Sequence, residues 1–190
     1  MDLFPEREYQ NGLKKILQVV SPGKLILRSK PMKVSEKDVH DLIRKHNFFD
    51  RSKNLSSNGF PHEYKEMDIN GDKVIFDKFS CLMWQQSGSE KDMSFENAKN
   101  WIKELNRNRF AGFNNWRLPT LEEAMSLMEP KLKNGLYVNP IFDHVQQWIW
   151  TADQYIGAAG RHWVVVFDSG KCSCDLFFAR DSCVRAVRSI

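Results

Sequence analysis

The chain has 190 residues, of which 42% are hydrophobic and 27% charged. This composition excludes a disordered chain and suits one ordinary globular domain with its own core. Lys and Arg number 28 against 24 Asp and Glu, so the formal net charge is only +4. The basic residues alternate with acidic ones, as at Glu36–Asp38, which is typical of a solvated surface. We therefore expect no nucleic-acid partner.

The N-terminus lacks the pattern of an exported protein. Residues Met1–Arg7 show no basic stretch followed by an apolar one, and so they predict no secretory signal. No segment reaches the uninterrupted apolar length that a membrane span needs. As written, the sequence predicts a cytoplasmic protein that does not bind membranes.

Residues 1–70 predict a small helical segment of unknown role. An apolar, lysine-bearing run at Leu13–Val20 indicates a first helix, which Ser21–Gly23 ends. Ser35 is typical of a helix N-cap, and acidic residues follow it in the first turn, where they suit the helix dipole. Asn54–Pro61 is polar and contains Gly and Pro, so it predicts a loop.

A second region begins at Asn70–Gly71, which is a turn signal. Val74–Phe76 and Leu82–Trp84 are short and apolar, as strands are. Ser94 predicts the N-cap of a helix whose apolar residues fall on one stripe, and we expect that stripe to face the core.

The next helix begins after Thr120. Thr120 and Glu123 have the spacing of a capping box, which predicts a helix from Leu121. We expect Pro130 to end that helix, because proline cannot continue one.

The rest of the chain predicts strands joined by turns. Asp168–Lys171 is a hairpin turn, and we expect the first and last strands of the region from Gly71 to pair. The predicted strands are Trp148–Thr151, Trp163–Phe167, Cys172–Phe178 and Cys183–Arg188. Helices embedded among short antiparallel strands define the α+β class.

Seven short motifs occur in a fixed order along residues 71–190. They are Leu82–Gln85, Ser94–Ala98, Asn115–Thr120, Asn139–Phe142, Trp150–Thr151, Trp163–Phe167 with Gly170, and Val184–Arg188. In this order they resemble the bacterial Lcl-type C-terminal domain, a domain family of unknown function. The resemblance implies a C-type-lectin-like fold, distantly similar to formylglycine-generating enzymes, and a domain that binds glycans or other surface ligands. Family members are often exported.

The cysteines do not predict a catalytic or metal centre. Without a secretory signal we expect Cys81, Cys172, Cys174 and Cys183 to be free thiols. A zinc site built from the last three with His162 would lack the usual Cys-x-x-Cys spacing, so we expect no zinc. Calcium is not expected either, because no loop groups the carboxylates that it prefers. We expect no cofactor.

Three arginines lie in the motifs, and we interpret each as structural. Arg117 lies among Trp, Leu and Pro, which predicts a guanidinium that bonds loop carbonyls and stacks on an aromatic ring. Arg185 and Arg188 are three positions apart on a predicted strand. They would then point to opposite faces, so that at most one points inward.

Aromatic and polar residues gather in the late loops, at Asp153–His162 and Cys172–Arg180, and they form our predicted binding site. Trp150 and Phe177 could instead belong to the core. The candidate residues are Trp150, Asp153, Gln154, Tyr155, Arg161, His162, Asp175, Phe177 and Arg180.

These observations favour a non-catalytic, calcium-independent domain that binds a glycan or a protein. Two alternatives stay open. One is an oxidase of the formylglycine-generating type, which needs reactive thiols. The other is a structural scaffold that docks a partner through residues 1–70.

Overall fold

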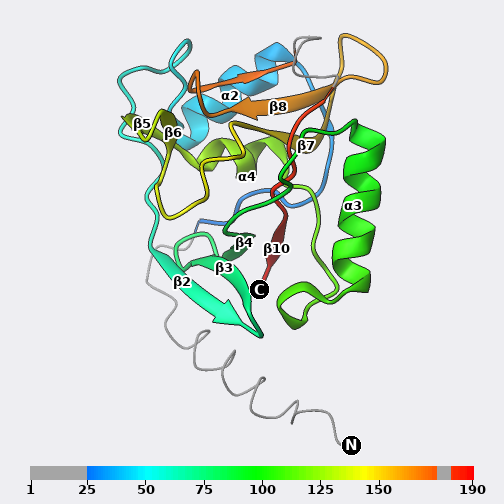
Figure 1. The fold of residues 1–190 in the computed structure, drawn as a ribbon. Helices are drawn as coiled ribbons and strands as arrows, with labels where there is room; N and C mark the ends of the chain where they lie inside the picture. The colour runs from blue at the N-terminus through cyan, green and yellow to red at the C-terminus, as the bar shows by residue number, and fades with distance from the viewer. Residues whose placement is uncertain (1–24, 175–180) are drawn as a thin grey trace, which may run out of the picture.

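The computed structural model describes residues 25–174 and 181–190 (Figure 1). The predicted helix Leu13–Val20 lies outside the described residues, and so does the second half of the predicted strand Cys172–Phe178. The site candidates Asp175, Phe177 and Arg180 also lie outside them.

Three α-helices in the described residues begin where the sequence predicts. They are α2 (Glu36–His46), α3 (Phe95–Arg107) and α4 (Leu121–Ser126). A short 3-10 helix, η1 (Phe110–Gly112), lies between α3 and α4. The predicted caps Ser35, Ser94 and Thr120 each accept a hydrogen bond from a first-turn amide. Because capping is local in sequence, it is readable without tertiary information.

Ten strands in the same residues form two four-stranded sheets and one ribbon, and the described fold is therefore α+β. The sheets run β1-β7-β8-β9 and β10-β4-β3-β2, and the ribbon is β5-β6. Only the β1–β7 pair is parallel. The strands are β1 (Lys33–Val34), β2 (Tyr64–Ile69), β3 (Asp72–Asp77), β4 (Leu82–Gln85), β5 (Met128–Lys133), β6 (Leu136–Val138), β7 (Trp148–Tyr155), β8 (His162–Val166), β9 (Lys171–Ser173) and β10 (Val187–Ser189).

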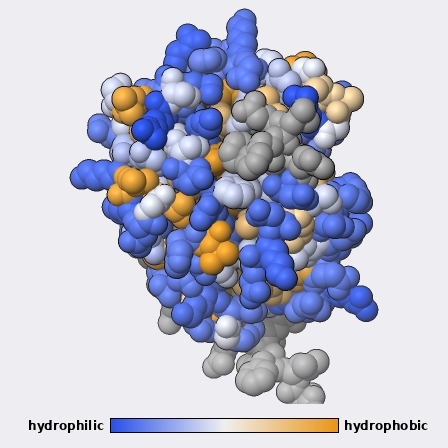
Figure 2. Space-filling view, turned by 45° about the horizontal axis from the view of Figure 1, so that its top comes forward, coloured by the Kyte–Doolittle hydropathy of each residue, from blue (hydrophilic) through white to orange (hydrophobic). Residues whose placement is uncertain are grey.

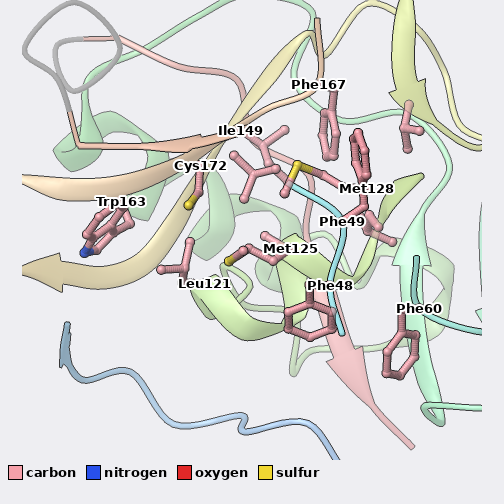
Figure 3. Packing of buried hydrophobic residues seen from close by; sticks show 14 of the residues in the cluster. Phe48, Phe49, Phe60, Leu121, Met125, Met128, Ile149, Trp163, Phe167 and Cys172 are labelled. Atoms are coloured by element: carbon pink, nitrogen blue, oxygen red, sulfur yellow. The ribbon is translucent and has the colours of Figure 1, made fainter. Parts of the chain in front are cut away.

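The main core joins both parts of the chain. Phe48, Phe49 and Phe60 pack in one buried cluster with Leu121 and Met125 of α4 (Figure 3). The boundary predicted at residue 71 falls at the turn of the β2–β3 hairpin, whose strands pair from end to end. Residues 25–70 thus contribute one helix, two strands and several core side chains to the same packed structure.

One helix prediction and two strand predictions were wrong in detail. α4 ends at Ser126 rather than at Pro130, which lies inside β5, where the β5–β6 ribbon is irregular and tolerates a proline. The last strand is β10 alone, shorter than Cys183–Arg188. Its partner is β4 and not β3, which lies on the other side of β4.

The two late arginines are both buried, contrary to prediction. Arg185 is 0% and Arg188 8% exposed. Alternation fails because Arg185 precedes the regular strand. Arg185 donates to the carbonyls of Ser87 and Asp143 and lies 4.9 Å from the Phe142 ring centroid. Both residues are structural, as expected.

The carboxylate of Asp153, fully buried on β7, holds three segments together. It accepts hydrogen bonds from the amide of Leu121, the first residue of α4, and from the amide of Met32, both at 2.7 Å. The Arg28 guanidinium donates to both of its oxygens, at 3.0 and 2.6 Å. Asp153 therefore fixes residues 28–32 and the start of α4 against β7.

Glu123, also fully buried, does the same for the loop before α4. It accepts from the Thr120 amide at 2.9 Å, which completes the capping box. Arg117 donates to both of its oxygens at 2.7 Å. These contacts agree with the structural role predicted for Arg117: its closest partner is a carboxylate, and it also donates to the Leu118 carbonyl at 3.4 Å.

Replacing Asp153 with Asn should destabilise the protein. The variant removes the closest charge partner of Arg28, which keeps only the longer contact with Glu122, and it removes an acceptor from buried amides. We expect a loss of about 2–4 kcal/mol in the free energy of unfolding, measured by denaturant titration. The matched control is Asp41→Asn, whose ion pair with Arg44 is exposed and should matter by less than about 0.5 kcal/mol. Equal effects of the two variants would contradict this account.

Candidate functional site

A groove of about 510 Å³ lies between α3 and β7. Its walls come from four separate parts of the chain: residue 31, α3, the loop before α4, and the β7–β8 hairpin. The groove residues are Pro31, Phe95, Lys99, Ile102, Lys103, Arg117, Leu118, Ala152, Gln154 and His162. A volume of this size is in the range of small-ligand pockets.

A second, smaller pocket of about 300 Å³ is lined by Glu90, Lys91, Asp92, Val145, Gln147, Trp148 and Cys183. The rest of the described surface offers less. Figure 2 shows a face that is largely hydrophilic, on which hydrophobic residues form small separate spots. The large exposed hydrophobic side chains of the described residues come from distant segments, among them Ile26, Leu55 and Leu132. Scattered single residues need no partner, and the groove is therefore the better candidate for a binding site.

One wall of the groove is a face of α3. Phe95, Lys99, Ile102 and Lys103 recur at intervals of three and four residues, so they share that face. The predicted stripe is less deeply buried than expected, because Ala98 is its only fully covered member. Phe95 and Ile102 are half-buried. The stripe packs against the buried clusters as predicted, but they cover it only in part, and Phe95 and Ile102 also line the groove.

The opposite wall is set by the two buried carboxylates. Glu123 holds Arg117, which precedes Leu118 on the groove. Asp153 lies between Ala152 and Gln154 on β7 and points to the other side, toward α4. Through the Met32 amide it also fixes the chain at Pro31. The wall is therefore held by charged contacts behind it.

His162 lies at the base of the groove against Phe95. The two rings stack with their centroids 3.3 Å apart. Burial lowers the pKa of His162 to about 4, although a backbone hydrogen bond with Asp153 and its charge act in the opposite direction. Its Nδ1 is buried and has no hydrogen-bond partner among residues 25–174 and 181–190. His162 is therefore neutral near pH 7.

Of the nine predicted site residues, the structure brings Gln154 and His162 to the groove. Trp150 is fully buried beneath it, where its Nε1 donates to the Met93 carbonyl. Tyr155 is half-buried with its ring against Trp163, and Arg161 is half-buried at the end of the turn before β8. Asp153 is a structural anchor.

Sequence reasoning missed most of the groove. Lys99 and Lys103 are four residues apart on one helix face, a signal that was available but was interpreted as solvated surface. Pro31, Arg117 and Leu118 carry no comparable signal, because only the tertiary fold brings them beside α3.

The residues considered for zinc lie in separate environments. The Cys172 thiol lies 3.6 Å from Asp50 and the Cys183 thiol 3.1 Å from Asp92. His162 stacks on Phe95 instead. Across residues 25–174 and 181–190, no three His, Cys, Asp or Glu side chains are grouped as metal ligands would be.

His62 and Asp77 form an Asp–His pair, but its geometry indicates a structural role and not a catalytic one. His62 Nδ1 lies 2.8 Å from Asp77, and its Nε2 lies 2.7 Å from the Ser126 carbonyl oxygen. Burial opposes ionisation of Asp77, yet hydrogen bonds from His62 and Ser80 hold its pKa below the usual value. Since Nε2 faces a carbonyl and not a hydroxyl or thiol, the pair activates no nucleophile.

The described chain is thus an α+β domain with a groove braced by buried carboxylates, and it belongs to the Lcl C-terminal domain family, whose model matches residues 73–188. This confirms the resemblance found in the sequence. Comparison with curated proteins and with solved structures gave no match. None of the described helices combines the length and the apolar character of a membrane span.

The low pKa of His162 predicts that the free energy of unfolding decreases when the pH is lowered. The unfolded state takes up a proton near pH 6.5, but the folded state does so only near pH 4. Stability should therefore decrease as the pH falls from 6.5 to 4. His46, whose pKa burial also lowers, adds to the same trend. In His162→Gln, melting temperatures measured across this range should depend less on pH; an unchanged slope would contradict the assignment.

Proposed function

We propose that this chain is a non-catalytic, calcium-independent binding domain whose ligand, part of a glycan or of a protein, occupies the groove between α3 and β7. The observation that carries the proposal is the groove itself: an open, mostly apolar pocket with charged side chains on its rim. Ligand sites combine an apolar lining with a few polar groups in this way. A C-type-lectin-like fold remains a prediction within this proposal.

The thiols support a binding domain over an oxidase. None of the four cysteines forms a disulfide, and all four are buried. Burial, with the nearby Asp92 carboxylate, raises the pKa of Cys183 to about 12. Burial and Asp50 likewise raise the pKa of Cys172 far above its usual value. Since the thiolate is the reactive form, these environments disfavour redox or nucleophilic chemistry.

Thiol titration tests the oxidase alternative. We expect no cysteine of the native protein to react with an aromatic disulfide reagent at pH 8 during the time in which the unfolded protein reacts fully. The cause is the burial of all four side chains together with the raised pKa values. Rapid reaction of one or two thiols in the folded protein would favour the oxidase over our proposal.

The groove itself is tested by a fragment screen followed by amide NMR shifts. We expect binding fragments to shift the amides of Leu118, Ala152 and Gln154 as one group. Ala152→Trp should abolish these shifts, because the indole fills a groove lined by the Ala152 side chain. Hits that map elsewhere, or no hits at all, would contradict the proposal.

Ala159→Trp is the matched control for this experiment. Ala159 is exposed in the turn between β7 and β8 and does not line the groove. The same large side chain placed there should leave the fragment shifts unchanged. Melting temperatures of both variants show whether Ala152→Trp still folds.

A further inference from the structure

We propose that the groove recognises a protein segment in which an apolar side chain is flanked by carboxylates. This inference rests on the proposed function and deepens it, because it chooses a protein ligand over a glycan. Three features of the described residues carry it: the apolar walls, the sign of the charges on the rim, and the lack of a ring face open to a sugar.

The two facing walls of the groove suit one apolar side chain between them. Phe95 and Ile102 come from α3, while Leu118, Ala152 and Pro31 form the facing wall. All five are apolar, and none contributes a side-chain hydrogen-bonding group. A bound leucine or phenylalanine would bury apolar surface from both sides, which is the main favourable term in such contacts.

The rim of the groove is positively charged. Lys99 and Lys103 lie on the α3 side and Arg117 on the other, and none of the ten described groove residues is acidic. Arg117 is neutralised from behind by Glu123, while Lys99 forms an ion pair with Glu96 in which both side chains are exposed. An exposed pair of this kind is weak and can exchange partners, so the lysines remain able to meet carboxylates of a ligand.

The same groove is poorly suited to binding a sugar. Sugar rings usually pack on an open aromatic face, and the aromatic ring of the groove is Phe95. His162 covers one of its faces with centroids 3.3 Å apart, and the Lys99 ammonium lies 5.8 Å from its centroid. Trp150 is fully buried. Gln154 is the one exposed amide side chain among the groove residues, which is too few to satisfy many hydroxyls.

Four probes separate these ligand classes. The acidic peptide is acetyl-Glu-Asp-Leu-Phe-Asp-Glu-amide, and its neutral counterpart carries Gln and Asn in place of Glu and Asp. The third probe is an acidic oligogalacturonate, and the fourth a neutral cello-oligosaccharide. Each is titrated into the full chain at low salt while the amide shifts of Leu118, Ala152 and Gln154 are followed.

We expect the acidic peptide to bind about threefold or more tightly than the neutral peptide, and both to bind more tightly than the two oligosaccharides. Neutralising the rim in the double variant Lys99→Gln/Lys103→Gln should remove the difference between the peptides. The control double variant Lys65→Gln/Lys73→Gln changes exposed lysines on β2 and β3 and should preserve it.

Equal binding of the two peptides, stronger binding of either oligosaccharide, or no shift with any probe would overturn this inference. The proposed function is judged separately by the fragment screen and Ala152→Trp, which do not depend on the charge of the ligand. A groove that binds fragments but does not prefer the acidic peptide would therefore sink only the further inference.

Discussion

The Asp153 carboxylate, with no exposed surface, accepts hydrogen bonds from the amides of Leu121 and Met32 and from both terminal nitrogens of Arg28. A carboxylate in such a place is costly unless its lone pairs are filled, and here two backbone amides and one guanidinium fill them. Because the carboxylate and its donors come from three segments, the ion can be satisfied only when β7, the start of α4 and residues 28–32 are all in place. The burial of one charge thus couples the N-terminal part of the described chain to the family domain.

Glu123 extends this arrangement by one turn of α4. Its carboxylate closes the capping box and binds Arg117. These contacts give the run Asn115–Thr120 a physical explanation, because the arginine, the proline before the cap and the cap itself lead the chain into a buried helix. The groove follows from the same contacts. Leu118 and Ala152 each lie one residue from a side chain in these charge contacts, and they form the wall that faces α3. The contacts of Asp153 and Glu123 hold this wall from the side away from the groove. Its groove-facing side is therefore available for binding.

The sequence predicted what is local and failed where distant segments meet. Caps at Ser35 and Thr120, and the turn at Asn70–Gly71, follow from neighbouring residues and were confirmed. The strand β2 before that turn was missed, because the segment was predicted to be helical. The predicted site covered one wall of the groove, at Gln154 and His162, and missed α3, since periodicity shows that residues share a face but not what covers it. Arg185 and Arg188 show the same limit: alternation holds only inside a regular strand, and their burial depends on carbonyls and rings contributed by other loops.

Hydrogen exchange at the Met32 amide tests the central claim, that a buried carboxylate fixes the N-terminal wall of the groove. Met32 has a side chain that is 47% exposed and follows three exposed residues, so its surroundings alone predict rapid exchange. If its amide is bound to Asp153, as the 2.7 Å distance indicates, it should exchange about as slowly as the Leu121 amide, which shares the same carboxylate. A Met32 amide that exchanges like that of a free loop, while Leu121 stays protected, would contradict the account.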